Sequence, residues 1–84
     1  MITATIKETK KVKGVITEKR TIICYHSIDK ARSELRPIGK DMAVCRKLGK
    51  IPTREVVAVS YDTKSEKSLL LELKVITSIE NEEA

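Results

Sequence analysis

The chain has 84 residues, of which 40% are hydrophobic and 35% are charged, and its formal net charge is +5 at pH 7. This composition is typical of one soluble globular domain and excludes an intrinsically disordered chain. Two cysteines are too few for a disulfide scaffold, and without Phe or Trp the core must be aliphatic. Because no apolar run is long enough for a signal peptide or a membrane span, we expect a cytoplasmic protein.

The basic residues are concentrated in the first two thirds of the sequence. Residues 1–54 contain 14 Lys or Arg and 5 Asp or Glu, whereas residues 55–84 contain 3 and 7. Such an asymmetric distribution favours attraction of a polyanion to one region of the molecule. The alternative is that the excess of lysines only keeps a small protein soluble.

The first part of the chain predicts a β-hairpin. Ile2, Ala4 and Ile6 alternate with polar residues, as in a half-buried strand. Residues 10–14 form a lysine-rich turn that ends in a glycine, and Val15–Tyr25 is the second strand. Lys19 and Arg20 mark either a bulge in this strand or the turn of an alternative register.

The next segment, Asp29–Lys50, has the only sustained helical period. Its apolar residues recur every three or four positions and so share one face: Ala31, Leu35, Ile38, Met42, Cys45 and Leu48. Pro37 and Gly39 interrupt the period. We therefore expect either a kinked helix or two short helices, over residues 29–35 and 39–48, with Gly49 ending the second.

Two further strands are predicted after the helix, Arg54–Asp62 and Ser68–Thr77, with a polar turn over residues 62–67. The order ββ-α-ββ predicts an α+β fold with an antiparallel sheet of about four strands and a broken or kinked helix on one face. Residues 1–79 form the single domain, and residues 80–84 form an acidic, frayed tail. Because the predicted strands near Val57 and Leu70 are apolar on both faces, we expect a homodimer.

No catalytic or metal-binding motif is present. Cys24, His26 and Cys45 are too few to hold zinc without a fourth ligand, and both cysteines are predicted to be buried thiols. His26 is the only histidine, so RNA cleavage would need an acid–base partner that the sequence does not identify. We expect a protein that is not an enzyme and uses no metal or cofactor.

The most informative pattern is a set of basic residues at the first turn, on the outer side of the helix and just after it. Long cationic side chains on a rigid element suit a phosphate backbone, although a solvated helix face has the same composition. The candidate nucleic-acid-binding residues are Lys10, Lys11, Lys13, Arg32, Arg36, Lys40, Arg46, Lys47, Lys50 and Arg54.

These residues predict a small nucleic-acid-binding protein that recognises mainly the backbone and has little sequence selectivity. Only Tyr25, Tyr61 and His26 are available to stack on bases. RNA is slightly preferred over DNA, because a short, broken helix fits a major groove poorly. The alternative is a protein-binding modulator or inhibitor that docks on an acidic partner surface.

Overall fold

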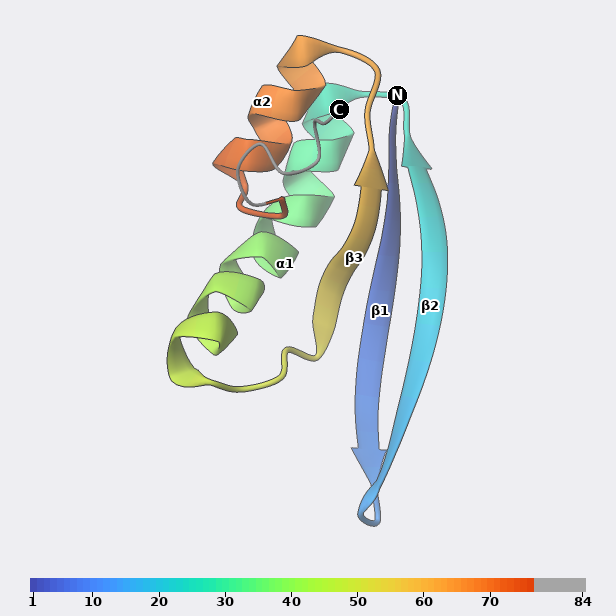
Figure 1. Cartoon of the computed structure of the whole chain (residues 1–84). Coiled ribbons are helices and arrows are strands. Elements are labelled where there is room, and N and C mark those ends of the chain that lie inside the picture. The colour runs from blue at the N-terminus through green and yellow to red at the C-terminus, as the bar shows by residue number, and fades with distance from the viewer. Residues whose placement is uncertain (77–84) are drawn as a thin grey trace.

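The computed structural model describes residues 1–76 and has the element order ββαβα. The strands form one antiparallel sheet in the order β2-β1-β3, and both helices cover the same face of it (Figure 1). The α+β class and the antiparallel sheet are therefore confirmed. The elements are β1 (Ile2–Val12), β2 (Val15–Tyr25), α1 (Ile28–Leu48), β3 (Arg54–Ser60) and α2 (Lys64–Glu72).

The hairpin of β1 and β2 is longer and more regular than predicted. Its two turn residues, Lys13 and Gly14, have φ angles of 50° and 82°, and two positive values define a type I′ turn that suits the twist of the strands. All residues pair one to one from Val12–Val15 to Ile2–Tyr25. The predicted bulge at Lys19 and Arg20 is therefore wrong.

The one irregularity of the sheet lies instead between β1 and β3. Thr5 pairs with Ala58 and the next residue, Ile6, pairs with Val56, so Val57 is the extra residue of a bulge. Val57 is 42% exposed. The bulge shifts the alternation of β3, which explains why Val56 and Val59 both contribute to the core face although they are three residues apart.

Helix α1 runs without interruption through Pro37, so the prediction of two short helices is wrong. Ser27 caps its first turn by accepting a hydrogen bond from the Lys30 N–H, and Gly49 ends it in the left-handed conformation at φ 70°. Leu35 and Ile38 flank the proline and are 0% and 2% exposed. Burial of two such side chains contributes roughly 3–6 kcal/mol, enough to offset a proline cost of about 3 kcal/mol.

The predicted strand over residues 68–77 is wrong, because α2 occupies residues 64–72. Thr63 and Glu66 form a reciprocal capping box: the Thr63 hydroxyl accepts from the Glu66 N–H at 3.1 Å, and the Glu66 carboxylate accepts from the Thr63 N–H at 3.2 Å. Leu69, Leu70 and Leu73 then lie on one buried face at helical spacing. The described sheet therefore has three strands rather than four, and Thr77 and residues 80–84 lie outside the described residues.

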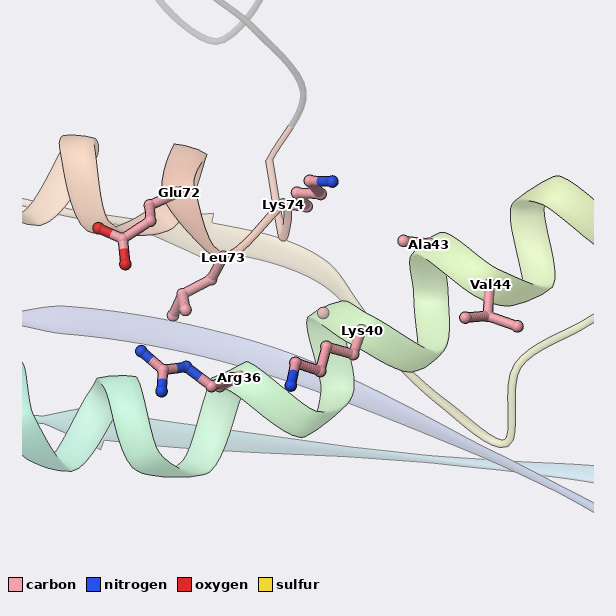
Figure 2. Close-up of a pocket in the computed structure, with 8 residues that line it drawn as sticks. Arg36, Lys40, Ala43, Val44, Glu72, Leu73 and Lys74 are labelled. Atoms are coloured by element: carbon pink, nitrogen blue, oxygen red, sulfur yellow. The ribbon is translucent and has the colours of Figure 1, made fainter.

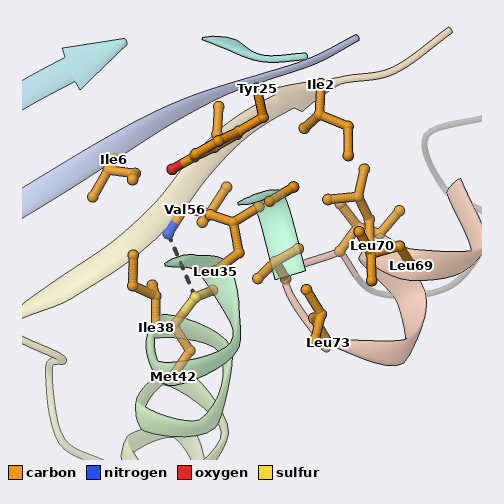
Figure 3. Packing of buried hydrophobic residues seen from close by; sticks show 14 residues of the cluster. Ile2, Ile6, Tyr25, Leu35, Ile38, Met42, Val56, Leu69, Leu70 and Leu73 are labelled. Carbon is orange, nitrogen blue, oxygen red and sulfur yellow. Dashed lines mark hydrogen bonds between the residues drawn. The ribbon is translucent and has the colours of Figure 1, made fainter. Parts of the chain in front are cut away.

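The core lies between the sheet and the two helices and consists of aliphatic side chains together with Met42 and Tyr25 (Figure 3). Ile2 and Leu35 are 1% and 0% exposed, and the Val56 N–H donates to the Met42 sulfur at 3.4 Å. The predicted apolar face of α1 is buried from Ala31 to Met42. Its last residue, Leu48, is 61% exposed because the helix extends past α2.

Gly39 determines how closely α2 approaches α1. A Cβ atom at this position would collide with the Leu73 carbonyl oxygen and press on a Val75 methyl group at 3.3 Å. The backbone after α2 therefore contacts the α1 backbone directly. The glycine that the sequence identifies as a helix breaker acts here as a contact residue.

We expect Gly39→Ala to destabilise the protein by about 1–3 kcal/mol, although alanine is the better helix former, because the collision is with backbone that cannot rotate away. Urea unfolding followed by circular dichroism measures the change. Ala43→Gly, one turn later, is the matched control and should cost about 1 kcal/mol from helix propensity alone. A stabilised Gly39→Ala variant would contradict the close contact.

We also expect Glu66→Gln to lower stability near neutral pH while retaining the capping box. Hydrogen bonds from the Met1 ammonium group at 2.6 Å and from the Asp62 N–H at 2.7 Å lower the pKa of Glu66 below 4.5. A lowered folded-state pKa stabilises the protein above the unfolded value and loses this effect as the pH falls through the folded value. Thermal melts should therefore separate the two proteins at about pH 7 and converge at about pH 2; an equal difference at both pH values would exclude this ion pair as the cause.

Candidate nucleic-acid interface

The distal half of the β1–β2 hairpin extends beyond the body of the molecule (Figure 1). The molecule measures 43 × 25 × 24 Å, and residues 10–22 are exposed. The register brings the two strands of this half together, with Lys10 opposite Thr17 and Glu8 opposite Lys19. The predicted lysines at positions 10, 11 and 13 thus lie on a projecting two-stranded ribbon, together with Lys19.

The C-terminal end of α1 lies at the same end of the molecule. The loop that follows α1 returns to the sheet where β3 begins, and the Thr9 N–H donates to the Thr53 carbonyl at 2.8 Å. Arg46 and Lys47 occupy the last turn of α1, and Lys50 follows its glycine cap. Residues about 35 positions apart in the sequence are therefore brought to one region.

A depression of about 530 Å³ marks the junction between hairpin and loop. Lys11 and Ile16 line it from the hairpin, and Lys50 and Ile51 line it from the loop. Gly49 and Pro52 form part of its wall. Two ammonium groups from different elements thus border a single concave surface, which suits an anionic group.

We define the cationic end by the basic residues of the distal hairpin, the last turn of α1 and the following loop. Within residues 1–76, none of these side chains forms an ion pair, whereas the neighbouring Glu18 and Glu55 are both paired with Lys7, at 3.7 and 3.2 Å. These two carboxylates are therefore paired with a residue outside the cationic end, whereas Glu8 lies opposite Lys19 in the hairpin. The members are Lys10, Lys11, Lys13, Lys19, Arg46, Lys47 and Lys50.

Arg36 and Lys40 lie elsewhere, on the outer side of α1. Together with Lys74 they border a groove of about 410 Å³ between the two helices (Figure 2). The rest of its lining is mostly apolar and includes Val44 and Leu73. The predicted outer face of the helix is exposed at Arg36 and Lys40, and these two residues border the groove between the helices rather than the depression at the cationic end.

The last two predicted residues join neither group. The Arg32 guanidinium lies 3.6 Å from the Asp29 carboxylate and is 39% exposed. Arg54 lines a cavity of about 280 Å³ beneath α1, together with Tyr25 and Glu34. Arg32 is therefore engaged by an ion pair on α1, whereas Arg54 is exposed at the start of β3 and forms no ion pair within residues 1–76.

Tyr25 is buried in the core, so it is not available for stacking on bases. Tyr25 is 3% exposed, and its hydroxyl group lies near the Glu34 carboxylate but meets no hydrogen-bond geometry among residues 1–76. Burial, followed by the nearby Glu34 carboxylate, raises its pKa to about 12. Cys24, its neighbour in β2, points to the opposite face and is exposed, so the predicted burial of this thiol is wrong.

The described residues contain no metal-binding cluster. No group of three or more His, Cys, Asp or Glu side chains within residues 1–76 could hold an ion. His26 is exposed beside Lys30 and Glu34 at a shallow depression after β2. Within the same residues, no helix is both long and apolar enough to cross a membrane.

Sequence reasoning missed Lys19 and Lys74. Lys19 was assigned to a bulge, and regular pairing of β1 with β2 would have placed it on the projecting ribbon. Lys74 has a positive φ of 61° in the turn after α2, and it was hidden by the incorrect strand prediction. No local sequence signal places it at the same groove as Arg36, because that arrangement depends on the packing of α2.

These features define an α+β protein with a three-stranded antiparallel sheet, helices on one face, and a projecting basic hairpin. Comparisons with protein-family models, with curated proteins and with solved structures found no match.

We expect Tyr25→Phe to leave the free energy of unfolding unchanged or to increase it by up to about 1 kcal/mol. The substitution removes a buried hydroxyl group that has no partner, while the ring keeps its packing. Denaturant unfolding of both proteins measures the change. A loss of more than about 1 kcal/mol would indicate that the hydroxyl group has a partner, either the Glu34 carboxylate or an ordered water molecule.

Proposed function

We propose that this protein binds nucleic acid through the cationic end and does so without catalysing a reaction on it. The observation that carries the proposal is the convergence of basic side chains from the hairpin, from the last turn of α1 and from the following loop. Several ammonium and guanidinium groups on a rigid, projecting end can each replace a counterion on a phosphate.

The chemistry of this surface supports recognition of the backbone rather than of the bases. It is formed by flexible cationic side chains, and none of its seven residues is aromatic. Tyr25, the residue expected to stack, is buried. We therefore propose weak sequence selectivity and an affinity that falls steeply with salt concentration.

The structure does not support the reason for preferring RNA over DNA. The preference assumed a short, broken helix, whereas α1 is continuous over 21 residues. Its length is about 31 Å at 1.5 Å per residue. A two-stranded ribbon is also an element that enters the major groove of DNA. The proposal therefore covers the phosphate backbone of both nucleic acids.

The groove between α1 and α2 supports a second candidate, the docking of an acidic protein segment. Its apolar lining, with Val44 and Leu73, would accept a hydrophobic side chain, and Arg36, Lys40 and Lys74 at its border would pair with carboxylates. The Glu72 carboxylate at the same groove reduces this attraction. We rank this function second because its cationic side chains are fewer.

The decisive experiment compares two double charge reversals of equal net change. We expect Lys11→Glu with Lys50→Glu to weaken binding to mixed-sequence RNA and DNA by at least about tenfold. The slope of log affinity against log salt concentration should also fall, by the amount that about two phosphate contacts contribute. Arg36→Glu with Lys40→Glu should leave both nearly unchanged. Fluorescence anisotropy over a salt series measures affinity and slope, and thermal melts check that both variants are folded.

If Arg36→Glu with Lys40→Glu weakens binding and Lys11→Glu with Lys50→Glu does not, nucleic acid binds at the groove between α1 and α2. No binding by the wild-type protein at low salt would exclude the proposed function. In that case, titration with an acidic peptide that contains one leucine tests the second candidate, and only the variant with Arg36→Glu and Lys40→Glu should lose this interaction.

A further inference from the structure

Strand β2 is an open edge of the sheet. It pairs with β1 on one side only, and no other element of the described chain pairs with its second side. It is 11 residues long, and most of its residues are exposed, including large aliphatic ones. Val15, Ile16 and Ile22 are 61%, 57% and 69% exposed. Long, regular edges of this kind are available for pairing with another strand.

The hairpin turn determines which backbone groups face this edge. A two-residue type I′ turn makes Val12 and Val15 a hydrogen-bonded pair, and the direction of the N–H and C=O groups alternates from there along β2. The backbone groups that point away from β1 therefore belong to the even-numbered residues: Ile16, Glu18, Arg20 and Ile22.

The side chains of this edge are arranged symmetrically about Lys19, so that residues at equal distances on either side are similar or complementary. Moving outward from Lys19, Glu18 corresponds to Arg20, Thr17 to Thr21, and Ile16 to Ile22. An antiparallel strand of the same sequence, centred on Lys19, would therefore place opposite charges, hydroxyl groups and aliphatic side chains against each other. All four even-numbered edge residues would fall on hydrogen-bonded positions.

We propose that two copies of the chain pair through β2, in antiparallel register, with the two Lys19 residues opposite each other on the two-fold axis. The contact is isologous, as expected for a symmetric dimer. It joins the two sheets into one sheet of six strands and forms about eight new backbone hydrogen bonds, two for each directly opposed hydrogen-bonded pair.

Side chains on both faces of the sheet support this register. On the face away from the helices, Ile16 packs against Ile22 of the second copy, and Glu18 faces Arg20 of the second copy. Within one chain, these two charged groups are 3.7 Å apart and exposed. On the other face, the two Lys19 side chains repel each other, but each has Glu8 of its own chain as its cross-strand neighbour.

This interface differs from the one that the sequence predicted. That prediction depended on an apolar strand around Leu70, which instead lies in α2 and is 0% exposed. The present argument depends only on β2 and does not require the proposed nucleic-acid function.

A charge-exchange cycle tests the pairing. We expect Arg20→Glu to raise the dimer dissociation constant by at least about tenfold, because it replaces two opposite-charge pairs with two like-charge pairs. Adding Glu18→Arg to this variant should restore the wild-type value. Lys64→Glu, with the same charge change on α2, should have little effect. Sedimentation equilibrium measures all four proteins, and thermal melts confirm folding.

A cysteine experiment tests the register. In a Cys24→Ser, Cys45→Ser background, Lys19→Cys should form a disulfide-linked dimer under mild oxidation, because directly opposed residues at a position without hydrogen bonds have Cα atoms about 4.5 Å apart. Thr17→Cys should not, since its two copies would lie four residues apart along the strand, about 13 Å. A monomeric wild-type protein at its solubility limit, or equal crosslinking at both positions, would overturn the proposal.

Discussion

The packing of α1 across one face of the sheet is the contact on which the rest of the structure depends. Leu35 and Ile38 are buried against the sheet on either side of Pro37, and α2 reaches the same core only because Gly39 lets its C-terminal end approach. With both helices on one side, the sheet keeps an open face and β2 remains a free edge. Those exposed surfaces follow from the limited size of an aliphatic core in a chain of this length.

The same packing explains the arrangement of charge. Helix α1 ends beside the projecting half of the hairpin, so basic residues near positions 11 and 50 are brought together. Along the face away from the helices, Lys7 is placed between Glu18 and Glu55 by cross-strand register. Two carboxylates that would weaken an anion-binding surface are thereby paired with a residue outside it, while Glu8 remains opposite Lys19. Basic residues from three elements therefore lie at one end of the molecule, in addition to Arg36 and Lys40 along α1.

Much of the fold was readable from local patterns. Alternation identified β1, and helical spacing identified the buried face from Ala31 to Met42. Helix α2 was also readable, because Thr63 and Glu66 are a capping-box pair and Glu66, Leu69, Leu70 and Leu73 follow helical spacing. It was missed because adjacent leucines were taken for a strand buried on both faces. The continuity of α1 through Pro37 and the division of the basic residues into two surfaces depend on tertiary packing, which local patterns do not contain.

The two proposals meet in the distal hairpin. Pairing through β2 would place Lys10 and Lys19 of both copies near the two-fold axis and would put the turn at Gly14 opposite Cys24 of the second copy. The two cationic ends would then form one longer surface, able to contact more phosphates than either alone. A nucleic acid long enough to span both ends would bind the dimer more tightly than the monomer. By thermodynamic linkage, it would also strengthen dimerisation by the same factor.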